Sequence, residues 1–223
     1  GDVTTEKLEI EKHAYLTGKV FQIESDLIYD DVQKILTIKP TIAELKGSAF
    51  NVSGTYNWKT KNLVDITVDG KDTDVQTILS LLPEATAGSF DKYRSKGDIY
   101  IRATVKGEIS DKHSPSFSVN FGAKNATQFH PDYKSKIENA NLEGSCYTKE
   151  VLNSSSGVLT LKNIAGRLNG EPFAANLVVR DFENPDVVCD FKGKVDAASL
   201  LGFYPIPDVR NASGSLLATS TSS

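Results

Sequence analysis

The sequence predicts a mainly β fold, a largely antiparallel sheet that carries two short amphipathic helices. Three observations predict it: apolar and polar residues alternate in short runs, turn residues separate those runs, and two stretches show helical spacing instead. The alternation is clearest in residues 63–69, where Val64, Ile66 and Val68 share one face and polar residues occupy the other. One apolar and one polar face is typical of an antiparallel sheet with water on one side.

The same alternation continues along the chain. In residues 187–191 it places Val187, Cys189 and Phe191 on one side of a strand. Further strand-like runs cover residues 15–23, 34–39, 49–56, 99–105, 117–121, 157–161 and 173–179. The turn signals between these runs include Asn169-Gly170 and Asp69-Gly70.

Two stretches have the periodicity of helices. The first helix is expected over residues 75–82, where apolar residues recur at positions i, i+3, i+4 and i+7 before Pro83. The second is expected over residues 197–204, between the capping residue Asp196 and Pro205. Each helix has a single apolar stripe and is too short to be stable alone, so we expect both to pack on the sheet.

The two halves of the sequence match each other at an offset of 123 residues. At that offset Leu36-Thr37-Ile38-Lys39 aligns with Leu159-Thr160-Leu161-Lys162, and Gly47, Phe50 and Gly70 align with Gly170, Phe173 and Gly193. This indicates an internal repeat, with one unit over about residues 28–122 and a second, incomplete unit over about residues 151–223. We therefore expect residues 1–223 to form a single elongated β domain that is a fragment of a longer protein.

Composition and motifs exclude several classes of function. The 223 residues carry a formal net charge of −4, and their Lys and Arg residues are scattered, whereas phosphate binding needs them clustered, so a nucleic-acid partner is excluded. His13, His113 and His130 lack the spacing of metal ligands, and no phosphate-binding loop, dinucleotide-binding motif or nucleophile elbow is present. We expect no metal, no cofactor and no catalytic activity.

Two features leave other functions open. Trp58, the sole tryptophan, lies in a polar stretch and would either stack on a sugar, as in a carbohydrate-binding or adhesin-like β module, or cover a sheet edge. Asp181, Glu183 and Asp186 surround an expected turn and include pairs such as glycosidases use, although solvated turn charges are the better interpretation.

The sequence gives few signals about compartment. It leaves open whether Cys146 and Cys189 form a disulfide or stay free. No apolar run reaches the roughly 20 residues of a membrane-spanning helix, and the first residues show no signal-peptide pattern.

Several of these segments resemble the AsmA-like family. The resemblance rests on residues 36–39, 50–54, 63–70, 81–83, 97–99 and 115–117, and it recurs from Phe173 to Pro205. It covers most of the chain, from about residue 28 onward. The resemblance implies an elongated, curved β-sheet with an apolar groove along its concave side, in a long periplasmic protein anchored in the inner membrane by an N-terminal helix. This sequence contains no such anchoring helix.

The resemblance also implies a function. It points to a non-catalytic role in outer-membrane biogenesis or in lipid transport between the membranes, with phospholipid or acyl chains and other envelope proteins as partners. The expected lipid-facing groove residues are Val64, Ile66, Val68, Val187, Cys189 and Phe191. The alternative is that these residues form a closed core beneath the two helices.

Overall fold

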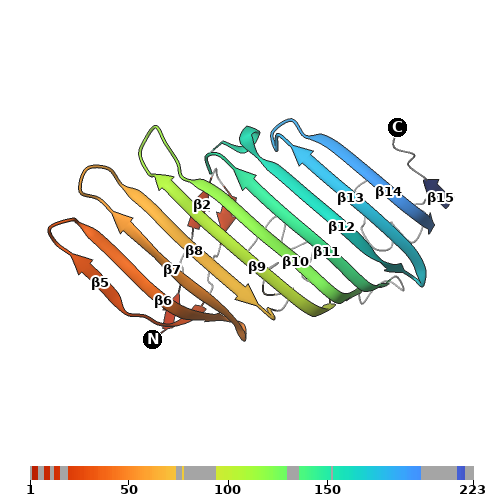
Figure 1. Ribbon diagram of the computed structural model, residues 1–223, viewed down its shortest axis with the longest axis horizontal. Coiled ribbons are helices and arrows are strands. Elements are labelled where there is room, and N and C mark those ends of the chain that lie inside the picture. The colour runs from red at the N-terminus through yellow and green to blue at the C-terminus, as the bar shows by residue number, and fades with distance from the viewer. Residues whose placement is uncertain are drawn as a thin grey trace.

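The chain folds mainly into one large antiparallel sheet (Figure 1). A computed structural model describes residues 2–4, 8–10, 13–15, 20–73, 77, 94–129, 136–151, 153–196 and 215–218. They form a sheet of thirteen strands and a separate sheet of two, so the predicted mainly β, antiparallel fold is confirmed.

The strands of the large sheet lie side by side nearly in their order along the chain (Figure 1). They are β1 Asp2–Thr4, β4 Val20–Glu24, β5 Leu27–Asp30, β6 Ile35–Leu45, β7 Ser48–Asn57, β8 Leu63–Lys71, β9 Arg94–Glu108, β10 Ser116–Phe129, β11 Lys136–Thr148, β12 Val158–Leu168, β13 Glu171–Arg180, β14 Asp186–Asp196 and β15 Ser215–Ala218. The small sheet pairs β2 (Leu8–Ile10) with β3 (His13–Tyr15), and a short 3₁₀ helix, η1, spans Ser154–Ser156. Since β4 and β5 pair with opposite ends of β6, they act together as one interrupted strand.

The sheet is open and uncurled, so the expectation of a curved sheet is wrong. β-Bulges bend strands, and a sheet curls when bulges are repeated along it. Register shifts occur in the β6–β7, β9–β10, β10–β11, β11–β12 and β12–β13 pairs. The β7–β8, β8–β9 and β13–β14 pairs run without one.

One side of the large sheet, which we call the apolar face, is hydrophobic across nine strands. Directly paired residues share a face. One row of such residues runs from β6 to β14 through Ala43, Phe50, Gly70, Ile101, Phe121, Gly144, Leu161, Leu177 and Cys189. A second row of the same face runs from β7 to β14 through Val52, Val68, Ala103, Val119, Cys146, Leu159, Val179 and Val187.

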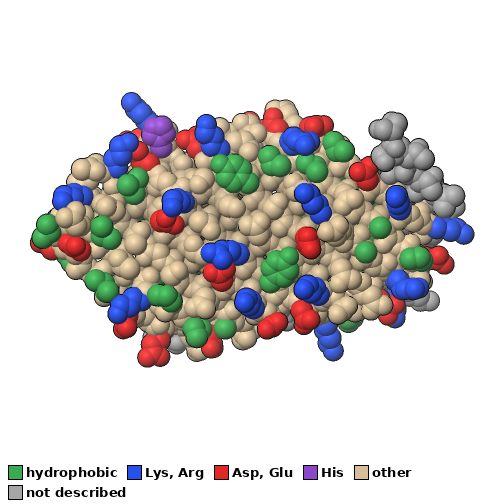
Figure 2. Space-filling view, viewed as in Figure 1, with side chains coloured by type: hydrophobic (Ala, Val, Ile, Leu, Met, Phe, Trp, Pro, Cys, Tyr) green, Lys and Arg blue, Asp and Glu red, His purple; other side chains and the backbone are tan. Residues whose placement is uncertain are grey.

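The opposite side, the polar face, carries acids and bases on neighbouring strands. Lys106 Nζ lies 2.6 Å from Asp65 Oδ2, and Arg102 Nη1 lies 3.6 Å from Asp69 Oδ1, both between β8 and β9. Figure 2 shows Lys and Arg beside Asp and Glu over the face turned to the viewer. Exposed ion pairs of this kind add little stability, but they keep this side of the sheet in water.

Strands β6 and β7 have bounds that correspond closely to those of β12 and β13. Each of the four strand ends differs from its counterpart by 123 residues, from Ile35 and Val158 onward. Both hairpins turn through two residues of positive φ, Lys46 and Gly47 in one and Asn169 and Gly170 in the other. Two such residues make the tight turn that matches strand twist, so the turn predicted at Asn169-Gly170 is confirmed.

The prediction of a turn at Asp69-Gly70 is wrong. Both residues lie inside β8, where Gly70 is paired with Phe50. A Cβ on Gly70 would lie 2.9 Å from the Phe50 ring, so the absence of a side chain here leaves space for the Phe50 ring from the neighbouring strand β7.

The two expected helices lie outside the described residues. Of residues 75–82 only Thr77 is described; it is helical and 2% exposed. Residues 197–204 are not among those described.

Candidate functional site: the apolar face

The six predicted groove residues all lie on the apolar face, in two groups. Val68 and Val187 belong to one row of paired residues, and the other four follow at alternate positions along β8 and β14. Six strand spacings separate β8 from β14, which is roughly 29 Å at about 4.8 Å each. The two groups are therefore distant parts of one surface, and residues such as Phe121 and Leu177 fill the space between them.

Burial differs strongly along this face. Leu45, Phe50 and Val64, at the β6–β8 end, are 2%, 4% and 8% exposed. On β14, Val187 is 55% exposed and Cys189 is also exposed, while the residues of β12 and β13 on this face are mostly half-buried. The face is therefore a closed core at the β6–β8 end and open to solvent towards β14.

Aromatic rings fill the places where this face has glycine. A Cβ on Gly144 of β11 would collide with the Phe121 ring, which lies over the glycine from β10. Farther along, the rings of Phe173 and Phe191 stack with centroids 6.4 Å apart and planes 13° apart. The resulting surface is apolar, so it offers contact area to an apolar ligand.

An aromatic cluster closes one corner of the face. Tyr29 and Tyr56 come from β5 and β7, on either side of Leu36 of β6, and the Trp58 ring lies 5.6 Å and 5.5 Å from them. Trp58 is nevertheless 37% exposed. Packing on the two tyrosines favours the interpretation in which Trp58 covers the corner of the sheet, and its exposed part leaves room for the stacking on a sugar that the alternative requires.

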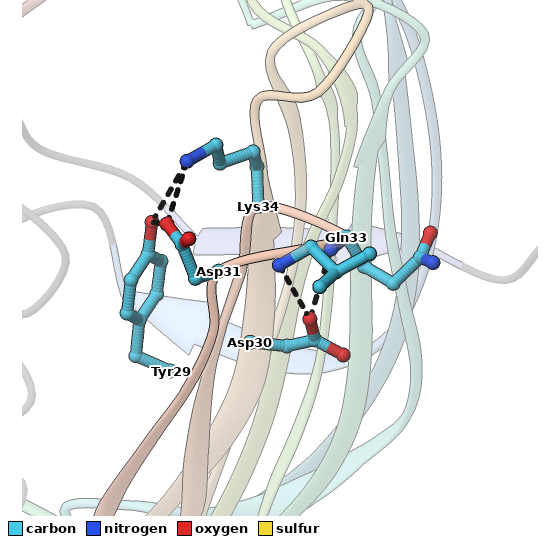
Figure 3. A network of polar contacts seen from close by, with 6 residues as sticks. Tyr29, Asp30, Asp31, Gln33 and Lys34 are labelled. Carbon is cyan, nitrogen blue, oxygen red and sulfur yellow. Dashed lines mark hydrogen bonds and ion pairs between the residues drawn. The ribbon is translucent and has the colours of Figure 1, made fainter.

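A charged pair lies beside this cluster (Figure 3). Lys34 Nζ donates a hydrogen bond of 2.6 Å to Asp31 Oδ1, and the Tyr29 hydroxyl donates another of 2.8 Å to the same oxygen. The bond from Lys34, followed by that from Tyr29, lowers the pKa of Asp31, and the bond to Asp31 raises the pKa of Lys34. Both groups are therefore ionised at neutral pH and cancel each other's charge at this corner.

The two cysteines are free and distant from each other. Cys146 on β11 and Cys189 on β14 are three strand spacings apart, roughly 14 Å, whereas a disulfide needs Cα atoms within about 7 Å. Their pairing is open from the sequence alone, and the structure places them too far apart to bond within one chain.

The two thiols are expected to react at different rates. Burial raises the pKa of Cys146, which lowers its reactive thiolate fraction, while Cys189 is exposed. Iodoacetamide at pH 8 should alkylate Cys189 first, as followed by peptide mass spectrometry. Equal rates in the folded protein would contradict this placement, and equal rates in urea are the control.

The carboxylates considered for acid–base chemistry belong to a turn. Asp181 Oδ1 accepts hydrogen bonds from the backbone N–H groups of Glu183 and Asn184 at 3.0 and 3.1 Å, and Asp186 Oδ2 lies 3.9 Å from Arg180 Nη1. Asp181 therefore has a structural role in the β13–β14 connection. His113 lies on the exposed β9–β10 connection, with Nδ1 3.5 Å from a Glu150 oxygen.

Neither the described helices nor comparisons with known proteins assign a function to this chain. Within the described ranges no helix is long and apolar enough to span a membrane. A scan against protein-family models, a search of curated proteins and a search of solved structures each found no match to this chain.

Proposed function

We propose that this chain is a non-catalytic segment of an AsmA-like envelope protein that holds acyl chains along its apolar face. Its role would lie in outer-membrane biogenesis or in lipid transport between the membranes. The observation that carries the proposal is the pair of apolar rows that cross the sheet up to β14, where they are half-buried or exposed. A solvent-exposed apolar surface of this extent is typical of a binding surface.

The chemistry of the face suits an acyl chain. The ligand would need no hydrogen bonds, and the face offers aliphatic and aromatic carbon from Phe121, Leu161 and Leu177. Each buried CH₂ contributes about 0.8 kcal/mol, so about eight methylenes would contribute roughly 6 kcal/mol before the cost of ordering the chain. The proposed groove residues Val187, Cys189 and Phe191 lie where the face is most accessible.

The bounds of β6 and β7 differ from those of β12 and β13 by 123 residues, which supports a repeated unit in the chain. The β8 and β14 strands also begin 123 residues apart, at Leu63 and Asp186. We infer two copies of one unit, over about residues 28–122 and 151–223, that extend the apolar face in a single direction. A periplasmic location, an inner-membrane anchor elsewhere in the protein and contacts with other envelope proteins complete the proposal.

Adjacent residues of β13 provide a matched test of binding. Leu177 lies on the apolar face and Val178 on the polar face, and both are half-buried. Leu177→Gln should weaken binding of a fluorescent fatty acid by about tenfold, or ~1.4 kcal/mol, because a polar amide would meet the acyl chain. Val178→Gln should bind as the unaltered chain does.

The measurement is a fluorescence titration of the purified protein with the fatty acid, alongside circular dichroism of each variant. Equal weakening in both variants, or no binding by the unaltered chain, would contradict the proposal. Binding of glycans that is lost in Trp58→Ala would instead support the carbohydrate-binding alternative.

A further inference from the structure

Within the part of the chain that the structure describes, the outer edge of β14 has no partner strand over most of its length. β15 pairs only with Gly193–Asp196, so among the described residues Asp186–Lys192 pair with β13 alone. The stretch of β8 that lies 123 residues earlier, Leu63–Asp69, pairs with both of its neighbours. The contrast shows in burial, since Val64 is 8% exposed and its counterpart Val187 is 55% exposed.

The sequence of this edge is complementary to itself except where Val188 would lie opposite Asp190. If a second β14 lies antiparallel to the first with Cys189 opposite Cys189, then Asp186 lies opposite Lys192 at both ends. On the apolar face the same register places Val187 opposite Phe191. Opposite charges and apolar residues in directly facing positions stabilise antiparallel pairs.

We propose that the free edge of β14 pairs with the same edge of a second copy of this chain, about a two-fold axis at Cys189. An exposed strand edge presents unpaired N–H and C=O groups and readily pairs with another chain. The acid–base matching resembles that inside the sheet, where Asp65 and Asp69 of β8 face Lys106 and Arg102 of β9.

A second copy fits this edge for two further reasons. This register pairs the odd-numbered residues of one β14 with the odd-numbered residues of the other. The apolar faces of the two chains therefore lie on the same side of the combined sheet and form one larger surface. A two-fold contact also closes on itself as a dimer, whereas a contact between unlike edges would continue into a filament. The dimer would thus extend the apolar face across two chains.

Two lysines on β14 give a matched pair of charge reversals. Lys192 is exposed on the free edge, and Lys194 is exposed two residues later, where β15 already pairs with β14. Lys192→Glu places a carboxylate opposite Asp186 twice in the dimer and should raise the dimer dissociation constant at least tenfold. Lys194→Glu should leave that constant unchanged.

Sedimentation equilibrium of the full chain, under reducing conditions, measures the dissociation constant. Diamide, a thiol oxidant, then tests the register, since two facing thiols lose two protons and two electrons to it and form one disulfide. Cys146→Ser should still form a covalent dimer and Cys189→Ser should not. A monomer at all concentrations, a dimer unaffected by Lys192→Glu, or a cross-link that requires Cys146 would each overturn the proposal.

Discussion

Replacing Leu45 with alanine is expected to lower the free energy of unfolding by about 3 kcal/mol. Leu45 ends β6 on the closed part of the apolar face, is 2% exposed and has the buried Ser48 opposite it. Truncation removes its contacts and leaves a cavity that the tight hairpin at Lys46 and Gly47 cannot readily close.

Urea unfolding followed by Trp58 fluorescence measures this loss, because unfolding separates the indole from the two tyrosine rings. Leu63→Ala is the control, since Leu63 is 42% exposed at the start of β8. Leu63→Ala should lower the free energy of unfolding by less than about 1 kcal/mol. Equal losses in the two variants would show that the β6–β8 end is not a closed core.

Replacing Gly97 with alanine is expected to cost about 3 kcal/mol for two combined reasons. Gly97 has a φ of 143°, a conformation that residues with a Cβ rarely adopt. An added Cβ would also lie 2.6 Å from the Cα of Ala126, at the register shift between β9 and β10. Lys96 and Asp98, on either side of Gly97, both pair with β10, which limits how far this backbone can move.

Gly47→Ala separates these two causes. Gly47 has a φ of 80° but an added Cβ would meet nothing within 4 Å. Its substitution carries the conformational cost alone, about 1 kcal/mol. The same urea titration compares both variants, and a Gly97→Ala cost no larger than that of Gly47→Ala would contradict the close approach at Ala126.

Alternation of apolar and polar residues predicted much of the sheet. Residues 63–69 and 187–191 lie in β8 and β14, with their apolar members on one face as expected. The pattern was sufficient there because β-branched and aromatic residues mark both the strand and its apolar side.

Strand β11 was not predicted, for a physical reason. Its residues on the apolar face include Gly144 and Cys146, and asparagines interrupt it at Asn139 and Asn141. Leu142 lies on the same face, but the apolar bulk over Gly144 comes from Phe121 of the neighbouring strand. Only a short alternation over residues 142–146 therefore marks β11 as a strand.

The exposure of the residues at the candidate site could not be predicted from the sequence either. Val64 and Val187 are the same residue in the same pattern, yet one is buried and the other exposed. The difference arises because β9 pairs with β8 over its full length, whereas β15 reaches only the last part of β14. Whether a neighbouring strand is present is a property of the assembled sheet.

Native mass spectrometry of the purified chain, with lipid extraction of the same sample, tests the central claim most directly. The proposed function predicts masses shifted by bound phospholipid or fatty acid in the unaltered chain and in Val178→Gln. It predicts a marked loss of these adducts in Leu177→Gln, because only that residue lies on the apolar face. A folded protein that gives only the lipid-free mass, with no lipid in the extract, would contradict the claim that this face holds acyl chains.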